Sequence, residues 1–115
     1  GTTWANPSDI RLKDNVTNYA KGINELKQVQ VRTWDYNGKG GTTAGLKGLG
    51  VVANEIELVL PDMVDTYEAK LNETDEEVTA IKKVDATEIT WLLVTSLQEA
   101  IAKIEALEAI VGYNK

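Results

Sequence analysis

Hydrophobic residues in the C-terminal quarter of the chain follow a heptad spacing. Residues 86–111 contain no glycine or proline and consist mostly of good helix formers. The a positions of the heptad are Thr90, Leu97, Ile104 and Val111, and the d positions are Leu93, Ala100 and Leu107. We therefore predict one long helix over residues 86–112 that stops at Gly112, a residue type that commonly follows the last helical turn.

The hydrophobic stripe of this helix is wider than a two-stranded seam, because Val94, Ile101 and Ile110 extend it to the e and g positions. This width suits three helices, or one helix that also packs on its own domain. Lys103 at g and Glu108 at e favour a parallel arrangement. The scarcity of other helical patterns favours an oligomer over packing within one chain. The predicted trimer interface consists of Leu93, Leu97, Ala100, Ile104, Leu107 and Val111.

The N-terminal segment changes character after its first proline. Residues 1–7 show no periodicity and end in Pro7, so we expect a leader, either the end of an upstream fibre or an artificial extension. Residues 16–29 carry apolar positions at spacings of three and four, which predicts a short helix despite Gly22. Asn15 is the expected cap of that helix.

Short β patterns occupy the middle of the chain. Residues 29–36 alternate and run into Asn37-Gly38, a favoured hairpin turn, so we predict a strand there. Residues 49–53 predict a short buried strand, and residues 53–61 predict one or two helical turns that Pro61 closes.

A second hairpin completes the pattern, with strands over residues 63–69 and 77–84 and a polar turn between them. The predicted fold class is therefore α+β. It is a small mixed domain with short β-hairpins and a long C-terminal helix that forms a parallel trimeric bundle.

The composition of the chain limits the partners it can bind and the reactions it can catalyse. The chain has 115 residues, a net charge of -6, no cysteine and no histidine. The acidic balance disfavours nucleic acid as a partner, and no apolar run is long enough to cross a membrane. Disulfides, thiol catalysis and histidine-dependent sites are excluded, so any catalysis would use Ser, Lys, Asp, Glu or Tyr. We expect no metal and no cofactor.

Most apparent motifs have structural explanations. The glycine-rich stretch 38–50 fits neither a phosphate loop nor a dinucleotide fingerprint and predicts a flexible hairpin loop. The acidic residues between 65 and 77 lack the spacing of a calcium loop and predict a solvated turn. Trp34, Tyr36 and Trp91 are interpreted as core or interface anchors.

Ser8 and Lys13 are the one pair with a chemical interpretation that needs no histidine. A neutral lysine can deprotonate a serine hydroxyl, provided that burial lowers the pKa of the lysine. If residues 8–13 form a turn, Lys13 can return to Ser8, whereas a continuous helix would place the two on different faces. The alternative is a structural corner, in which the amine pairs with a carboxylate such as Asp9 or Asp14.

Four segments together resemble a known family. They are SDIRLKDNV (8–16), GINELKQVQVRTWDYNG (22–38), GVVANEIELVLPDMV (50–64) and VDATEITWLLVTSLQEAIAKIEALE (84–108). In this order they are similar to the peptidase S74 family, the intramolecular chaperone auto-processing domains of phage tailspikes, tail fibres and endosialidases. The resemblance covers residues 8–107. Asn54 stands where the family usually has Gln, Ala86 where it commonly has Tyr, and the histidine that some members carry near the pair is absent.

The resemblance implies a homotrimeric chaperone domain over residues 8–115 that registers an upstream fibre or tailspike segment of the same chain. Its globular part would span residues 8–85 and its trimerisation helix residues 86–112. Release by self-cleavage of the Pro7-Ser8 bond is implied, with Ser8 as nucleophile and Lys13 as base. Assembly would take place in the cytoplasm of the bacterial host, and an uncleaved domain would remain on the virion tail.

Three explanations stay open for the intact Pro7-Ser8 bond. The sequence carries residues 1–7 joined to Ser8, so this member cleaves only beside its native fibre, has not yet cleaved, or does not cleave at all. In the last case the domain would be a permanent trimeric tip of a tail fibre, with the glycine-rich loop in contact with a receptor.

Overall fold

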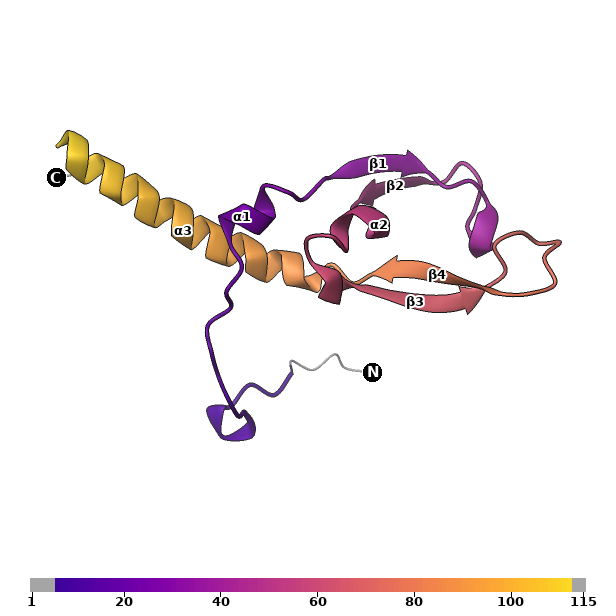
Figure 1. The fold of residues 1–115 in the computed structure, drawn as a ribbon, viewed down its shortest axis with the longest axis horizontal. Helices are drawn as coiled ribbons and strands as arrows, with labels where there is room; N and C mark the ends of the chain where they lie inside the picture. The colour runs from indigo at the N-terminus through magenta and orange to yellow at the C-terminus, as the bar shows by residue number, and fades with distance from the viewer. Residues whose placement is uncertain (1–5, 113–115) are drawn as a thin grey trace.

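The computed structural model describes residues 6–112 and shows an elongated molecule (Figure 1). Two hairpins form one end, and a long helix projects from the other. The elements in chain order are η1 (Ile10–Leu12), α1 (Ile23–Leu26), β1 (Arg32–Asp35), η2 (Lys39–Gly41), β2 (Lys47–Gly50), α2 (Ala53–Ile56), η3 (Pro61–Met63), β3 (Val64–Ala69), β4 (Thr79–Val84) and α3 (Thr87–Val111). This confirms the predicted α+β class with two small antiparallel sheets and a long C-terminal helix.

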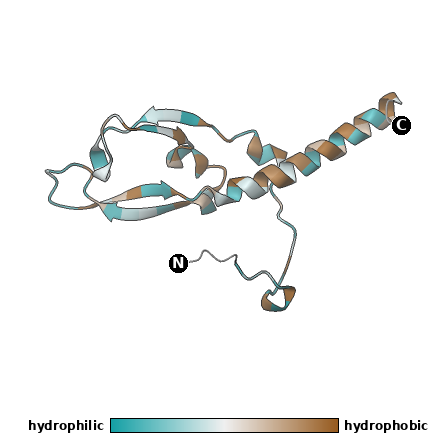
Figure 2. Cartoon of the chain, turned by 180° about the vertical axis from the view of Figure 1, so that it is seen from behind, coloured by the Kyte–Doolittle hydropathy of each residue, from teal (hydrophilic) through white to brown (hydrophobic). Residues whose placement is uncertain are grey.

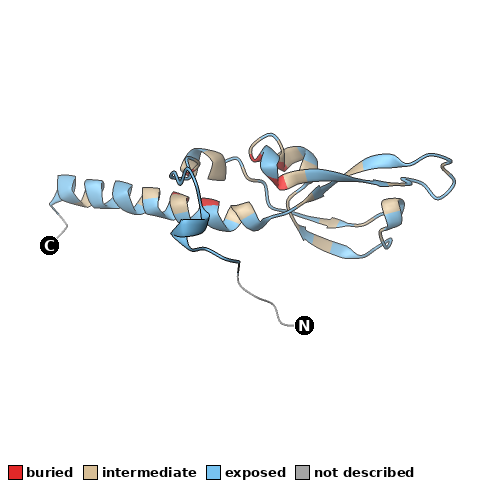
Figure 3. Cartoon of the chain, turned by 90° about the horizontal axis from the view of Figure 1, so that it is seen from below, coloured by how far each residue is buried: buried red, intermediate tan, exposed pale blue. Residues whose placement is uncertain are grey.

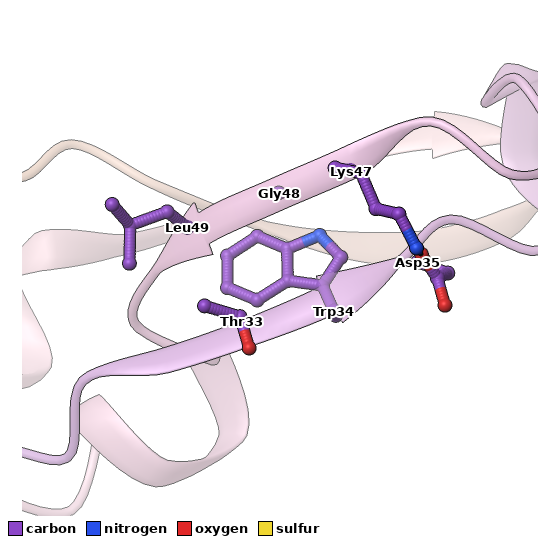
Figure 4. Close-up of a pocket in the computed structure, with 6 residues that line it drawn as sticks. All are labelled: Thr33, Trp34, Asp35, Lys47, Gly48 and Leu49. Atoms are coloured by element: carbon purple, nitrogen blue, oxygen red, sulfur yellow. Dashed lines mark ion pairs between the residues drawn. The ribbon is translucent and has the colours of Figure 1, made fainter.

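The first hairpin pairs β1 with β2, and its register sets Trp34 opposite Gly48. The indole lies across the neighbouring strand at that point (Figure 4), and a Cβ atom on Gly48 would overlap its ring. Trp34 also meets Tyr36 edge to face, with ring centroids 5.9 Å apart. Glycine at position 48 is therefore required for the Trp34 indole to lie across the hairpin.

The connection between β1 and β2 is longer than the predicted two-residue turn. Gly38 does adopt a left-handed conformation (φ 88). The last hydrogen-bonded pair before the loop, however, joins Tyr36 to Leu46, with Tyr36 N donating to Leu46 O over 2.8 Å. Gly40 N donates to Leu71 O over 2.9 Å and ties this loop to the turn of the second hairpin.

The burial predicted for the strand over residues 49–53 is wrong. Leu49 lies in a sheet of only two strands, and its side chain is 74% exposed.

The second hairpin forms where it was predicted, although its strands begin one and two residues later, at Val64 and Thr79. β3 and β4 pair from Val64 opposite Val84 to Ala69 opposite Thr79. α2 supplies the predicted helical turn, although Pro61 starts η3 instead of closing α2.

The buried core lies where α2 and η3 meet the first turns of α3 (Figure 3). Within residues 6–112 the fully buried hydrophobic side chains are Ile56, Leu60, Met63 and Leu92. A core of this size fixes one end of α3 and leaves the remaining turns of the helix outside the domain.

The helix predicted over residues 16–29 is mostly wrong, because only α1 is helical. Gly22 has an extended backbone (φ -161, ψ -139), and its N–H donates to Glu25 Oε1 over 2.8 Å, which starts the helix at Ile23. Asn15 caps no helix and instead adopts a left-handed conformation (φ 56). Tyr19 and Lys21 form their hydrogen bonds with α3, so tertiary contacts override the local helical pattern.

α3 agrees with its prediction at both ends. The Asp85 carboxylate accepts hydrogen bonds from Thr87 N (3.0 Å) and Thr87 Oγ1 (2.6 Å), and these bonds hold the pKa of Asp85 below its usual value. Gly112 ends the helix in a left-handed conformation (φ 69). In the described part of the chain, neither α3 nor a shorter helix has the length and apolar character needed to span a membrane.

Candidate functional site

Residues 6–18 form an N-terminal arm that leaves the body of the domain (Figure 1), and all of them are exposed. The turn η1 within this arm is built by Asp9. Its carboxylate accepts a hydrogen bond from Arg11 N over 2.8 Å and pairs with the Arg11 guanidinium over 2.7 Å. Lys13 N then donates to Ile10 O over 3.1 Å. This single turn reverses the chain between Ser8 and Lys13.

The Lys13 amine donates a hydrogen bond to Ser8 Oγ over 2.8 Å. The expected proximity of the two side chains is therefore confirmed, while their catalytic role stays a prediction. Asp9 is occupied by Arg11, whose hydrogen bonds hold the pKa of Asp9 below its usual value. The alternative corner, in which Lys13 pairs with Asp9 or Asp14, is not what the structure shows, because among the described residues Lys13 bonds to Ser8 and forms an ion pair with neither carboxylate. At this distance a neutral amine can accept the serine proton.

The pair is open to solvent in a single chain. A lysine serves as a base only when it is partly dehydrated, so the isolated arm lacks one requirement for catalysis. Apolar side chains flank the pair, with Ile10 67% exposed, Leu12 69% exposed and Val16 62% exposed. Burial of these side chains against another protein segment would exclude water from the neighbourhood of the pair.

Residues 19–23, here called the strap, attach the arm to α3. Tyr19 OH and Lys21 Nζ both donate to Glu88 Oε2, over 2.5 Å and 3.1 Å. The bond from Tyr19 holds the pKa of Glu88 below its usual value. Partial burial, together with the bond to Glu88, raises the pKa of Tyr19 to about 12. At neutral pH both shifts favour a protonated Tyr19 hydroxyl beside an ionised Glu88 carboxylate.

Two further bonds of the strap involve its backbone. Thr95 Oγ1 donates to Lys21 O over 2.7 Å, and Ile23 N donates to Glu99 Oε1 over 3.2 Å. The latter bond lowers the pKa of Glu99. Sequence analysis missed these contacts, because their partners lie far apart in the chain and no local pattern marks them.

α3 presents two distinct faces. The face toward its own domain carries Glu88, Leu92, Thr95, Ser96 and Glu99. The heptad stripe lies on the other side of the helix. Hydrophobic segments, brown in Figure 2, recur along the projecting helix. The exposed fractions along the stripe are 51% at Leu93, 62% at Leu97, 56% at Ile104, 61% at Leu107 and 71% at Val111, and Ala100 is half-buried.

The packing of α3 on its own domain therefore leaves the stripe exposed except at Ala100. Trp91 is 60% exposed beside the stripe and is not part of the core. Lys103 pairs with Glu99 of its own helix over 3.3 Å. Apart from Ala100, the stripe is therefore an exposed apolar surface of the single chain.

The hollow on the first hairpin offers less chemistry than the arm. Its volume is about 500 Å³, and Figure 4 shows its lining of Thr33, Trp34, Asp35, Lys47, Gly48 and Leu49. Asp35 and Lys47 form an ion pair across the strands and so satisfy each other. Among residues 6–112 no group of three or more histidine, cysteine or acidic side chains is arranged to hold a metal ion.

The peptidase S74 family, described as chaperone of endosialidase, matches residues 8–65, half of the chain. The match begins at Ser8 and includes Lys13 and both strands of the first hairpin. The chain belongs to this family. No curated protein matches it. Family membership supports a chaperone-like role.

Proposed function

We propose that this domain is a C-terminal intramolecular chaperone that trimerises through α3 and registers an upstream segment of a phage tail fibre or tailspike. Residues 8–85 form its α+β part and residues 86–112 its trimerisation helix. The observation that carries the proposal is the exposed heptad stripe on the face of α3 that its own domain leaves uncovered. Self-cleavage before Ser8 then releases the domain in the cytoplasm of the bacterial host, and without cleavage it stays on the virion tail.

Burial of the stripe supplies the association energy. Each fully buried leucine or isoleucine contributes roughly 1.5–3 kcal/mol. Parallel helices bring the hairpin ends and the arms of three chains together, which raises the local concentration of the upstream segments to the millimolar range. Pairing of strands between chains is slow and prone to errors of register, so early association through a helix is an advantage.

The arm carries the groups that an acyl-transfer step at the Pro7-Ser8 bond requires. Ser8 Oγ attacks the Pro7 carbonyl carbon while the hydroxyl proton moves to the Lys13 amine, which lies 2.8 Å from Oγ. The C–N bond to Ser8 breaks, and Lys13 returns the proton to the departing amino group. Water then hydrolyses the resulting ester, which gives a carboxylate on Pro7 and restores the serine hydroxyl. Packing of the arm within the trimer supplies the dehydration that Lys13 needs.

Sedimentation equilibrium of the chain tests the trimer. We expect about three times the chain mass of 12.6 kDa at micromolar concentration, because a stripe that reaches the e and g positions suits three helices. A mass of one chain over the same concentration range would contradict the proposal, and a stable dimer would contradict the three-helix seam.

A further inference from the structure

We infer that the strap is a positioning element, which fixes the arm that carries Ser8 and Lys13 to α3 and thereby sets the rate of cleavage. This inference rests on the proposed self-cleavage. Within the arm, side-chain hydrogen bonds join only arm residues to one another. The first polar contacts with the body occur at Tyr19 and Lys21. The position of the Ser8-Lys13 pair therefore depends on where the strap is attached.

The attachment combines side-chain and backbone contacts. Glu88 receives two donors from the strap, and its side chain is only 20% exposed. Thr95 and Glu99 bind the strap backbone at Lys21 O and Ile23 N, both in partly buried surroundings. Bonds to the backbone fix the path of the chain in a way that bonds to flexible side chains cannot, so the strap has one preferred path along α3.

Gly22 shows how closely the strap approaches the helix. The residue is buried, and a Cβ atom there would overlap Glu99 Oε1. Its backbone is extended (φ -161), which any residue can adopt, so the requirement is for space alone. A larger side chain would push the Glu99 carboxylate aside, and the bond from that carboxylate to Ile23 N would be lost.

The geometry allows the strap and the trimer to coexist. Glu88 and Thr95 occupy f positions of the heptad, and Glu99 occupies a c position, all of which face outward when a and d residues form the seam. Six Cα-to-Cα steps separate Tyr19 from Lys13, so the pair lies within about 20 Å of the strap. Docking of the strap on an outward face therefore places each Ser8-Lys13 pair close to the bundle without disturbing the seam.

The test uses the chain with its native upstream segment and two variants of the α3 residues that bind the strap. Thr95→Val removes the hydroxyl that binds Lys21 O, and Glu88→Gln removes the charge that Tyr19 and Lys21 share. Their matched controls are Thr95→Ser, which keeps the hydroxyl, and Glu105→Gln on an exposed turn of the same helix. Chain mass over time reports cleavage, and sedimentation reports the trimer.

We expect Thr95→Val and Glu88→Gln to cleave about tenfold to a hundredfold more slowly than wild type while remaining trimeric, because small errors of placement cost rates of this size. Thr95→Ser and Glu105→Gln should cleave at the wild-type rate. Wild-type rates in both trimeric strap variants would overturn the inference and leave the proposed function intact. A wild-type trimer whose chains stay uncleaved would instead overturn the proposed self-cleavage. The positioning role of the strap would be overturned with it.

Discussion

Ser8→Ala and Lys13→Ala each leave the leader attached, whereas the wild-type chain with its native upstream segment loses it and gains a new N-terminus at Ser8. The expected loss of cleavage is complete on the timescale of assembly, because the first variant lacks the nucleophile and the second lacks the base. Lys13→Arg should also fail, since a guanidinium keeps the positive charge but does not deprotonate at neutral pH. The measurement is the chain mass, followed over time by mass spectrometry.

Two controls separate a chemical role from a structural one. Lys27→Ala removes an exposed lysine outside the arm and should cleave at the wild-type rate. All variants should sediment as the same oligomer as wild type, because Ser8 and Lys13 lie outside the stripe. Release of the leader in Ser8→Ala at the wild-type rate would rule out the proposed nucleophile. Persistence of the intact chain in every variant and in wild type would favour the permanent trimeric tip.

Ile104→Asp is the second change with a large expected effect, and it should convert the trimer to monomers. The substitution removes roughly 5–9 kcal/mol of apolar burial over three chains and places three carboxylates in one layer of the seam. Since each 1.4 kcal/mol is a factor of ten, association should weaken at least a thousandfold. Sedimentation velocity measures the result directly. The fold of each chain should persist, because Ile104 is 56% exposed in the single chain and is not part of the core.

The matched control places the same carboxylate elsewhere on the helix. Ala102 is exposed at an f position, two residues away from Ile104. Ala102→Asp should therefore remain trimeric at concentrations that dissociate Ile104→Asp. Equal dissociation of both variants would show that helix stability, and not burial of the stripe, controls the oligomer.

The elements that could be predicted from sequence are those whose signals are local. α3 was predictable because an unbroken run of helix formers ends at Gly112, and the second hairpin because a polar turn separates two β patterns. The contact between Ser8 and Lys13 was also predictable, since one turn of chain brings them together. In each case the residues that determine the structure lie within a few positions of one another.

The predictions that failed concern residues whose structure depends on contacts far away in the chain. Residues 16–22 have the spacing of a helix, but Tyr19 and Lys21 have their hydrogen-bond partners on α3, some seventy residues away, and these contacts hold a non-helical path. Apolar spacing reports which residues can form a face, but it cannot report which distant backbone groups will bind the chain. The same holds for Leu49, whose apolar strand pattern predicted burial that a two-stranded sheet does not supply.

Deletion of residues 8–115 from the full-length protein is the most direct test of the chaperone role. The yield of soluble, trimeric upstream segment can be measured by size-exclusion chromatography with light scattering, beside the full-length protein and its Ile104→Asp variant. We predict that the deletion and Ile104→Asp both leave the upstream chains insoluble or unregistered. An equal yield of trimer from the truncated chain would contradict the proposed function.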